Sequence, residues 1–258
     1  MKDRIIGRVR RVNGPVIEAD GITDARMLEL VQVGESRLVG EVLKLSGDRA
    51  VIQVYEDTTG LAPRDNIYGA GRPLSLELGP GLIGSIYDGI QRLLEALRAL
   101  SGNFIESGIT AEPLDRARTW RFVPDPDLKP GARIEGGRIL GTVRETSRVE
   151  HRIPAPPDVS GILESLVPEG DYAVDHTAAV IRTENGSREL SLFHRWPIRT
   201  PRPVRRRLPL SVPLITGQRV IDTLFPLAKG GTVAIPGGFG TGKTMTQHAV
   251  AKWCDADI

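Results

Sequence analysis

The sequence has few of the features of a secreted or membrane-spanning protein. Cys254 is the only cysteine among 258 residues, so no internal disulfide is possible, and we expect its thiol to be buried in a helix. No apolar run reaches the length of about 20 residues that crosses a bilayer, and the first residues lead into no signal-peptide core. We therefore expect the chain to stay in the cytoplasm.

Excess charge of one sign and aromatic side chains are also scarce. The 34 basic and 32 acidic residues give a formal net charge of +2, and 5% of the residues are aromatic. A strong basic field and exposed aromatics are what many nucleic-acid-binding proteins use, so the composition gives no argument for nucleic acid. The densest basic cluster, which we expect to be a solvated linker, consists of Arg202, Arg205, Arg206 and Arg207.

The remaining composition, 40% hydrophobic and 26% charged, suits a globular chain of two or three domains. Residues 1–70 predict an antiparallel β-barrel, because short apolar runs at 4–12, 27–31, 38–45 and 50–55 are separated by turn residues. A closed barrel of five or six strands fits best. Such barrels often bind nucleic acid through exposed aromatic side chains. Tyr55 and Tyr68 are the only aromatic residues among residues 1–70, which favours a packing or assembly module.

Residues 71–112 predict a connecting segment with one helix. Leucines and isoleucines recur there at helical spacing between Ile86 and Leu100, and Ser101-Gly102 ends the run. We interpret this stripe as a core-facing surface that packs with a nucleotide-binding domain. Because the stripe is a packing surface, it indicates neither a membrane helix nor a cofactor site.

Residues 113–197 predict an inserted, β-rich domain. Prolines punctuate short β-like runs such as 138–143 and 161–167, and Asn185-Gly186 is a strong hairpin signal. The histidines of this region are too scattered to indicate a metal site.

Residues 198–258 predict the start of an α/β nucleotide-binding domain. A buried strand is expected at 231–236, and a helix should follow with Met245, Ala249 and Trp253 on one face. Between them lies a complete phosphate-binding loop (P-loop, or Walker A) of the pattern G-x-x-x-x-G-K-[ST]. Its residues are Gly237, Gly238, Phe239, Gly240, Thr241, Gly242, Lys243 and Thr244.

Each residue type in this loop meets a need of a bound polyphosphate. Glycines let successive N–H groups curl around phosphate oxygens, and the following helix directs the positive end of its dipole at the same charge. Lys243 is expected to reach the β- and γ-phosphates, and the Thr244 hydroxyl to ligate Mg²⁺.

Several segments resemble the catalytic A subunit of V/A-type rotary ATPases. They are residues 53–61, 76–82, 86–92, 213–222 and 236–244. The resemblance covers essentially the whole chain, and it implies an N-terminal β-barrel, an inserted bulge domain that F-type β subunits lack, and a RecA-like P-loop domain. Gly238 and Thr241 stand where the family often has Pro and Ser, positions that contribute mainly backbone N–H groups.

The resemblance also implies a function and partners. The family makes or hydrolyses ATP, coupled by rotation to H⁺ or Na⁺ transport, so ATP or ADP and Mg²⁺ are the expected ligands and Lys243 the expected catalytic residue. The implied partners are B subunits in an alternating A3B3 hexamer, central-stalk and peripheral-stalk subunits and, indirectly, the membrane sector, on the cytoplasmic face. No nucleic-acid partner is expected.

The family places further catalytic parts after the loop helix, and none has a counterpart in this sequence. They are a glutamate that polarises the attacking water, an acidic strand that supports Mg²⁺, and aromatics around adenine. Phosphoryl transfer depends on several such parts together. We therefore expect an N-terminal portion of the family's catalytic chain, truncated within its RecA-like domain and inactive by itself. A non-catalytic assembly fragment and a hexameric RecA-like RNA translocase are the alternatives.

Overall fold

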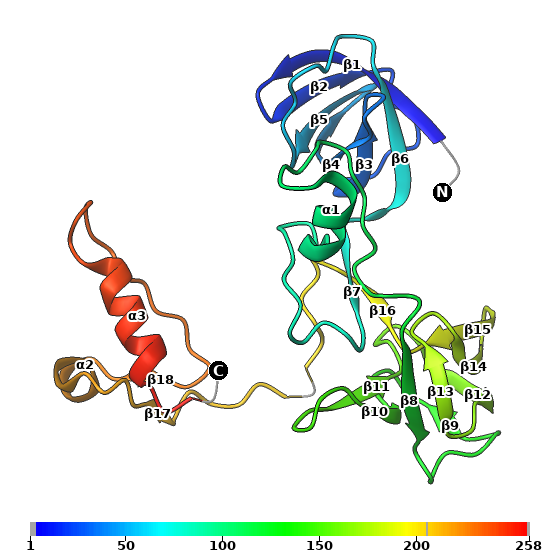
Figure 1. Ribbon diagram of the computed structural model, residues 1–258, viewed down its shortest axis with the longest axis vertical. Helices are drawn as coiled ribbons and strands as arrows, with labels where there is room; N and C mark the ends of the chain where they lie inside the picture. Colours follow the sequence, from blue (N-terminus) through cyan, green and yellow to red (C-terminus); the bar gives the residue numbers. More distant parts are fainter. Residues whose placement is uncertain (1–3, 205, 257–258) are drawn as a thin grey trace. The chain divides into compact units, whose positions relative to one another are not determined.

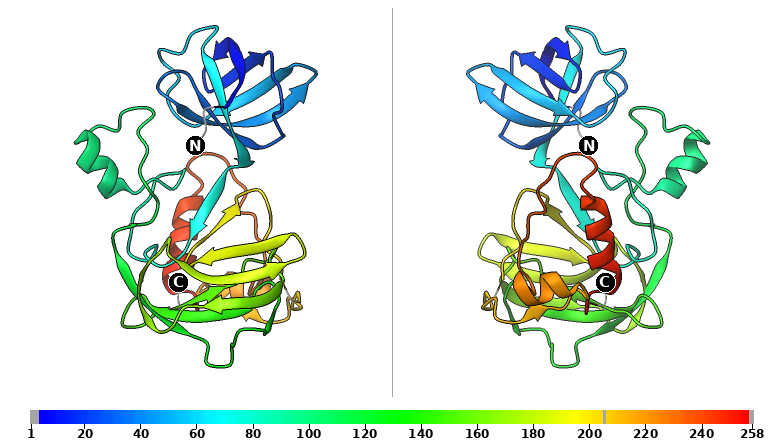
Figure 2. Two further views of the ribbon diagram at one scale, coloured as in Figure 1. Left: turned by 90° about the vertical axis from the view of Figure 1, so that its right-hand side faces the viewer. Right: turned by 90° about the vertical axis from the view of Figure 1, so that its left-hand side faces the viewer.

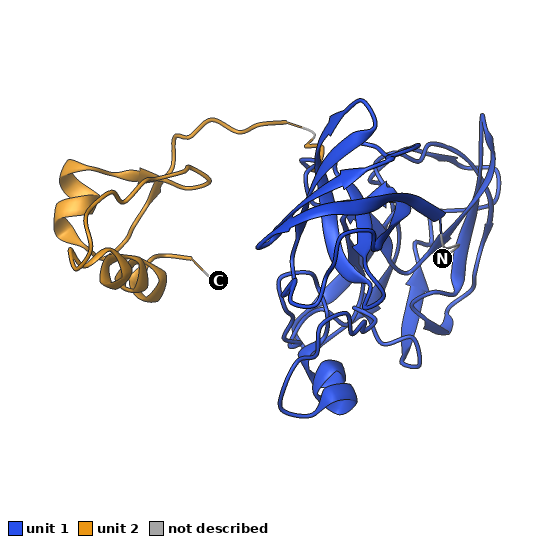
Figure 3. Cartoon of the chain, turned by 90° about the horizontal axis from the view of Figure 1, so that it is seen from above, with its two compact units in different colours: residues 1–201 blue, residues 202–258 orange. Residues whose placement is uncertain are grey.

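A computed structural model describes residues 4–204 and 206–256 of the chain. Contacts between Cα atoms divide it into two compact units, Met1–Pro201 and Arg202–Ile258, which are coloured separately in Figure 3. No helix in the described ranges is long and apolar enough to cross a membrane.

The first unit begins with a closed six-stranded barrel, as predicted (Figures 1 and 2). Neighbouring strands are antiparallel, in the order β1-β2-β5-β4-β3-β6. The strands are β1 (Arg4–Asn13), β2 (Val16–Asp20), β3 (Glu29–Val33), β4 (Leu38–Ser46), β5 (Arg49–Val54) and β6 (Asn66–Pro73). Alternate side chains along the strands fill the interior, where Ile17, Ile52 and Ile67 are fully buried.

The strand that leads out of the barrel, β7 (Ser75–Leu78), pairs with a strand from much later in the chain, β16 (His194–Pro197). β7 follows β6 almost directly, and its pairing with β16 is antiparallel, so that Glu77 lies opposite Arg195. Two segments more than a hundred residues apart are thereby joined. This pairing brings together the two ends of the segment between β7 and β16, which contains the inserted domain.

The helix of the connecting segment, α1 (Leu94–Ser101), begins later than the apolar stripe predicts. Gln91 has a φ of 64°, which is left-handed backbone, and the Asp88 carboxylate accepts a hydrogen bond of 2.7 Å from the backbone N–H of Arg92. Local bonds of this kind compete with a helix. Leu97 is the one buried residue of α1, so within the first unit this helix forms no broad core face. The predicted packing of the stripe with the nucleotide-binding domain stays a prediction.

The inserted domain is β-rich, as predicted, and consists of two four-stranded sheets (Figure 2). One has the order β11-β10-β8-β13 and the other β15-β14-β12-β9. The strands are β8 (Thr119–Pro124), β9 (Arg133–Ile134), β10 (Ile139–Arg144), β11 (Glu150–Pro154), β12 (Gly161–Leu166), β13 (Gly170–Ala173), β14 (Thr177–Thr183) and β15 (Gly186–Ser191). Separate apolar clusters form around Phe122 and around Ile181. The β14–β15 hairpin turns at the Asn185-Gly186 pair that the sequence marks.

The second unit is small and open. Its elements are β17 (Pro213–Leu214), α2 (Arg219–Leu224), β18 (Leu227–Ala228) and α3 (Lys243–Trp253), and β17 pairs with β18. The strand predicted at 231–236 was wrong, because these residues form no regular secondary structure. A buried strand needs neighbours that satisfy its N–H and C=O groups, and no described strand of this unit pairs with 231–236.

Two further expectations fall at the ends of this unit. Arg202, Arg206 and Arg207 of the basic cluster are exposed, and Arg205 lies outside the described residues. Cys254 is the C-cap of α3 and is half-buried, so the expectation of a thiol buried in the helix was wrong. A cap position lies at the open end of the helix, where neighbouring turns cover less of the side chain.

Candidate nucleotide-binding loop

The eight motif residues form a loop that turns directly into α3. The helix begins at Lys243, and its N-cap, Gly242, has a left-handed φ of 82°. Gly240 is also left-handed, with a φ of 79°. A β-carbon at either position would strain the backbone, which explains the need for glycine. The first turn of α3 carries no acidic residue, so the positive end of the helix dipole is not neutralised by its own side chains.

The Lys243 side chain folds back over the loop. Its ammonium group donates hydrogen bonds to the carbonyl oxygens of Gly237, at 2.5 Å, and Gly238, at 2.6 Å. The Thr241 hydroxyl donates to the same Gly238 carbonyl at 2.9 Å. Lys243 is the only cation among residues 237–244, and its ammonium group lies against backbone carbonyl oxygens of the same loop. Phosphate oxygens are stronger partners for an ammonium group than neutral carbonyls are.

Thr244 and both ends of the packing face predicted for α3 are exposed, whereas Ala249 is half-buried. Thr244 lies in the first helical turn, where its side chain is exposed. The packing face predicted for this helix is not covered by other described residues of its unit, since Met245 is 71% and Trp253 64% exposed. The helix was therefore predicted correctly and its packing was not. Helix formation follows from local residue preferences, whereas packing needs a partner surface.

A polar turn precedes the loop and was missed as a structural element by sequence reasoning. Thr216 is fully buried, and the Asp222 carboxylate accepts hydrogen bonds from its backbone N–H at 2.9 Å and its hydroxyl at 2.7 Å. These bonds, with a third from Gly217, hold the pKa of Asp222 below the ordinary value of 3.8. The sequence signal that could have indicated this turn is Thr216 six residues before Asp222, which lies in the first turn of α2.

The far end of α3 is tied to the same turn. The Asp255 carboxylate pairs with Lys229 at 2.8 Å and accepts a hydrogen bond of 2.9 Å from the backbone N–H of Ile215, and both contacts lower the pKa of Asp255. The backbone N–H of Asp255 donates in return to the Ile215 carbonyl at 2.9 Å. A β-carbon on Gly217 would lie 3.3 Å from the Trp253 side chain. These contacts anchor the C-terminal end of α3 to the turn at residues 215–217.

Acid is expected to loosen this turn. Because the folded pKa of Asp222 lies below the unfolded one, its carboxylate stabilises the fold above pH 3.8, and that contribution is lost as the pH falls from there through the folded pKa. Asp222→Asn should remove this part of the acid sensitivity and speed hydrogen exchange at the Thr216 and Gly217 amides at neutral pH. Asp171→Asn, at an exposed position of β13, is the control. Equal exchange in both variants would refute the role of Asp222.

The loop fits a phosphate better than a preformed metal site. In the described ranges, no group of three His, Cys, Asp or Glu side chains is placed to hold a metal ion. Residues 237–253 contain no carboxylate at all. Residues 237–253 could therefore offer Mg²⁺ hydroxyl oxygens such as that of Thr244, beside phosphate oxygens and water, but no carboxylate.

The three parts of the chain match three domains of one family. The matches are to the β-barrel domain of the ATP synthase alpha/beta family at residues 9–71, the barrel-sandwich domain of the same alpha/beta subunits at 111–199, and the family's nucleotide-binding domain at 217–258. The chain belongs to the ATP synthase alpha/beta family. This agrees with the closed barrel, the paired sheets of the inserted domain and the start of a nucleotide-binding unit.

Within this family the chain is similar to the A subunits of A-type ATP synthases. It is 53% identical over 254 residues to the A subunits from Desulfurococcus sp. (strain SY) and from Thermococcus onnurineus, and 51% identical over 253 residues to that from Saccharolobus islandicus. These matches cover 98% of this chain but 42–43% of the relatives. The predicted resemblance is confirmed, and the chain spans less than half the length of the curated relatives that it matches.

Proposed function

We propose that this chain is the part of the catalytic A subunit of a V/A-type rotary ATPase that binds the phosphates of the nucleotide. The observation that supports the proposal is the structure of the loop. The Lys243 ammonium group and the N-terminus of α3 both lie at this glycine-rich turn, and residues 237–253 contain no carboxylate. The complete protein then makes or hydrolyses ATP, coupled to H⁺ or Na⁺ transport. The similarity to A-type ATP synthases supports this function.

In this proposal the residues of the loop divide the work. Backbone N–H groups of Gly238, Phe239, Gly240, Thr241 and Gly242 surround the phosphates of ATP or ADP, and Gly237 leaves room for the chain to turn. The Lys243 ammonium group exchanges its two carbonyl partners for β- and γ-phosphate oxygens. The Thr244 hydroxyl holds Mg²⁺, which, when bound, neutralises phosphate charge. The loop positions the nucleotide and offsets its charge, the two contributions that dominate phosphoryl transfer.

The loop supplies no general base. Residues 237–253 contain no Asp or Glu, and the carboxylates of Asp222 and Asp255 are engaged in the turn that anchors α3. Polarising the attacking water therefore falls to groups outside the loop. We propose that the chain alone binds nucleotide without turning it over, and that turnover requires the complete protein in an A3B3 hexamer with B and stalk subunits at the cytoplasmic face of the membrane.

The proposed assignment also gives each region a role. Residues 1–70 are the barrel, 71–112 the connecting segment, 113–197 the inserted bulge domain and 198–258 the start of the nucleotide-binding domain. The connecting segment exposes Ile86, Leu100 and Phe104, which supports packing of this segment with the nucleotide-binding domain in the complete protein.

Thr244→Val tests the metal role of the loop. Valine keeps the shape of threonine but has no hydroxyl group, so the gain in ATP affinity on adding Mg²⁺ should fall by about tenfold, the size of one charge-assisted contact. The measurement is titration of a fluorescent ATP analogue with Mg²⁺ and with a chelator. Thr246→Val is the matched control, because the Thr246 hydroxyl bonds its own helix at the Gly242 carbonyl. An unchanged Mg²⁺ response in Thr244→Val would contradict the assignment.

A further inference from the structure

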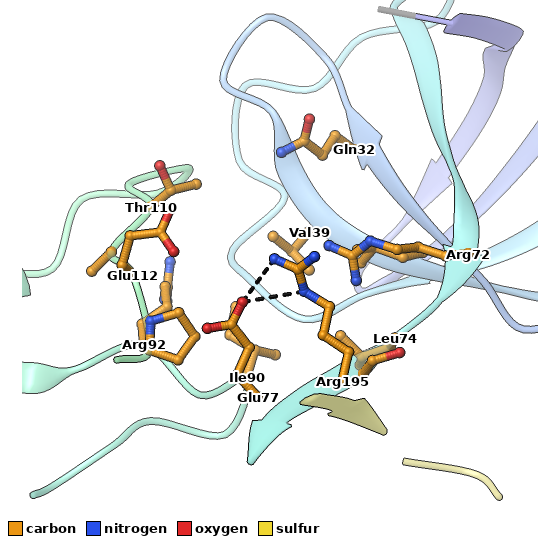
Figure 4. A pocket seen from close by; sticks show the side chains of 14 residues that line it. Gln32, Val39, Arg72, Leu74, Glu77, Ile90, Arg92, Thr110, Glu112 and Arg195 are labelled. Carbon is orange, nitrogen blue, oxygen red and sulfur yellow. Dashed lines mark hydrogen bonds and ion pairs between the residues drawn. The ribbon is translucent and has the colours of Figure 1, made fainter. Parts of the chain in front are cut away.

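A pocket separate from the nucleotide-binding loop lies wholly within the first unit. It forms where the barrel, the β7–β16 ladder and the connecting segment meet, and its volume is about 300 Å³ (Figure 4). Three arginines line it, Arg72 from the end of β6, Arg92 from the connecting segment and Arg195 from β16. The acidic lining residues are Glu77 and Glu112. Such a volume is at the small end of ligand pockets.

Two of the three arginines are committed to carboxylates. Arg195 donates to the buried Glu77 carboxylate at 2.8 Å, and Arg116 pairs with the other oxygen of the same group. Arg92 pairs with Glu56 at 2.8 Å and with Asp88 at 2.6 Å. The charges of these arginines are thus offset within the fold.

Arg72 is the exception. Among the described residues it makes no hydrogen bond or ion pair, although its side chain is half-buried. Burial, and then the positive charge of Arg195, lower the pKa of Arg72, and the Glu77 carboxylate, which is already bonded to Arg195 and Arg116, opposes part of this shift. Figure 4 shows both guanidinium groups at the same side of the pocket. A half-buried cation next to a second cation is costly unless an anion accompanies it.

We propose that this pocket binds a compact anion that carries phosphate or carboxylate groups. Arg72 supplies a complete guanidinium fork, and Arg195 adds Nη1, because its Nε and Nη2 both serve Glu77. Planar forks of this kind match phosphate and carboxylate oxygens. Glu112 lies at the opposite wall and pairs with Arg116 at 3.2 Å, so the anion occupies the side of Arg72. The pocket contains no residue of the nucleotide-binding loop, so variants of the loop and of the pocket can be tested separately.

The test uses the full chain carrying Lys243→Ala, which weakens phosphate binding at the loop. Inorganic phosphate and citrate are titrated separately by calorimetry, and hydrogen exchange is followed at residues 72–77. We expect binding of at least one anion with protection of these amides, and about tenfold weaker binding after Arg72→Gln. Phosphate binding without citrate binding identifies a phosphate site, and the reverse identifies a carboxylate site.

Two variants complete the test. Arg72→Lys keeps the charge but removes the fork, and it should give intermediate affinity. Arg133→Gln, at an exposed arginine of β9, should bind like the parent. The proposal is overturned if neither anion binds, or if Arg72→Gln binds as tightly as the parent. Protection confined to segments that do not line the pocket, away from residues 30–39, 72–77, 90–92, 110–113 and 195, would equally exclude this site.

Discussion

Replacing Lys243 with alanine in the complete protein is expected to abolish ATP turnover. Lys243 and Lys252 are the only basic side chains other than His248 in residues 237–253, and Lys243 alone reaches the loop. In the proposed function, its loss removes a preorganised charge from the point where negative charge develops in phosphoryl transfer. Removing one such donor costs at least about a hundredfold in kcat. Steady-state ATPase assays of the assembled complex measure the effect.

Two matched variants separate charge from loop structure. Lys252→Ala removes the same side chain from the last turn of α3, and it should leave turnover near that of the parent. Lys243→Arg keeps a cation that can still bond the Gly237 and Gly238 carbonyls, so it should preserve the loop while placing the charge differently. If Lys243→Ala retained full ATPase activity, the proposed role of the loop would be wrong.

The parts of the fold that the sequence predicts are those that depend on local pattern. The β4–β5 hairpin follows from alternating apolar residues on both sides of Gly47, whose φ of 61° suits the turn. The eight loop residues could be identified because they match a local motif, G-x-x-x-x-G-K-[ST], that is typical of phosphate-binding loops. Helix α3 begins where the motif requires.

The parts that could not be predicted depend on residues far apart in the chain. The apolar run at 231–236 has the composition of a buried strand, but a strand also needs paired neighbours, which a run of residues does not reveal. The first turns of the predicted helix in the connecting segment are replaced by a turn around Asp88. The pocket at Arg72 arises because β16 returns beside β7, and this register joins residues 77 and 195.

The ion-pair network at Arg92 shows the same dependence on distant residues. Glu56 lies just beyond the barrel strand β5, after Tyr55, and accepts hydrogen bonds from the backbone N–H groups of Val39, at 3.1 Å, and Gly108, at 2.9 Å. Arg92 joins this carboxylate to the connecting segment and also donates to the Ile109 carbonyl at 2.9 Å. One guanidinium group therefore links the barrel to two stretches of the segment that follows it.

Arg92→Met should destabilise the first unit by about 3 kcal/mol, the lower end of the cost of removing one partner from a buried pair. The side chain of Arg92 is 12% exposed and that of Glu56 6%, so water cannot replace the lost partner fully. Chemical denaturation measures the free energy of unfolding. Hydrogen exchange at the Val39 and Gly108 amides should accelerate, because both donate to Glu56.

An exposed ion pair of the same unit is the matched control. Arg121 and Glu169 also pair, at 2.7 Å, but their side chains are 66% and 49% exposed, and Arg121→Met should change stability by less than about 1 kcal/mol. A double variant, Arg92→Met with Glu56→Gln, should recover part of the loss, because it no longer leaves Glu56 charged and unpaired. Equal effects of the Arg92 and Arg121 variants would mean that burial does not strengthen the link between barrel and connecting segment.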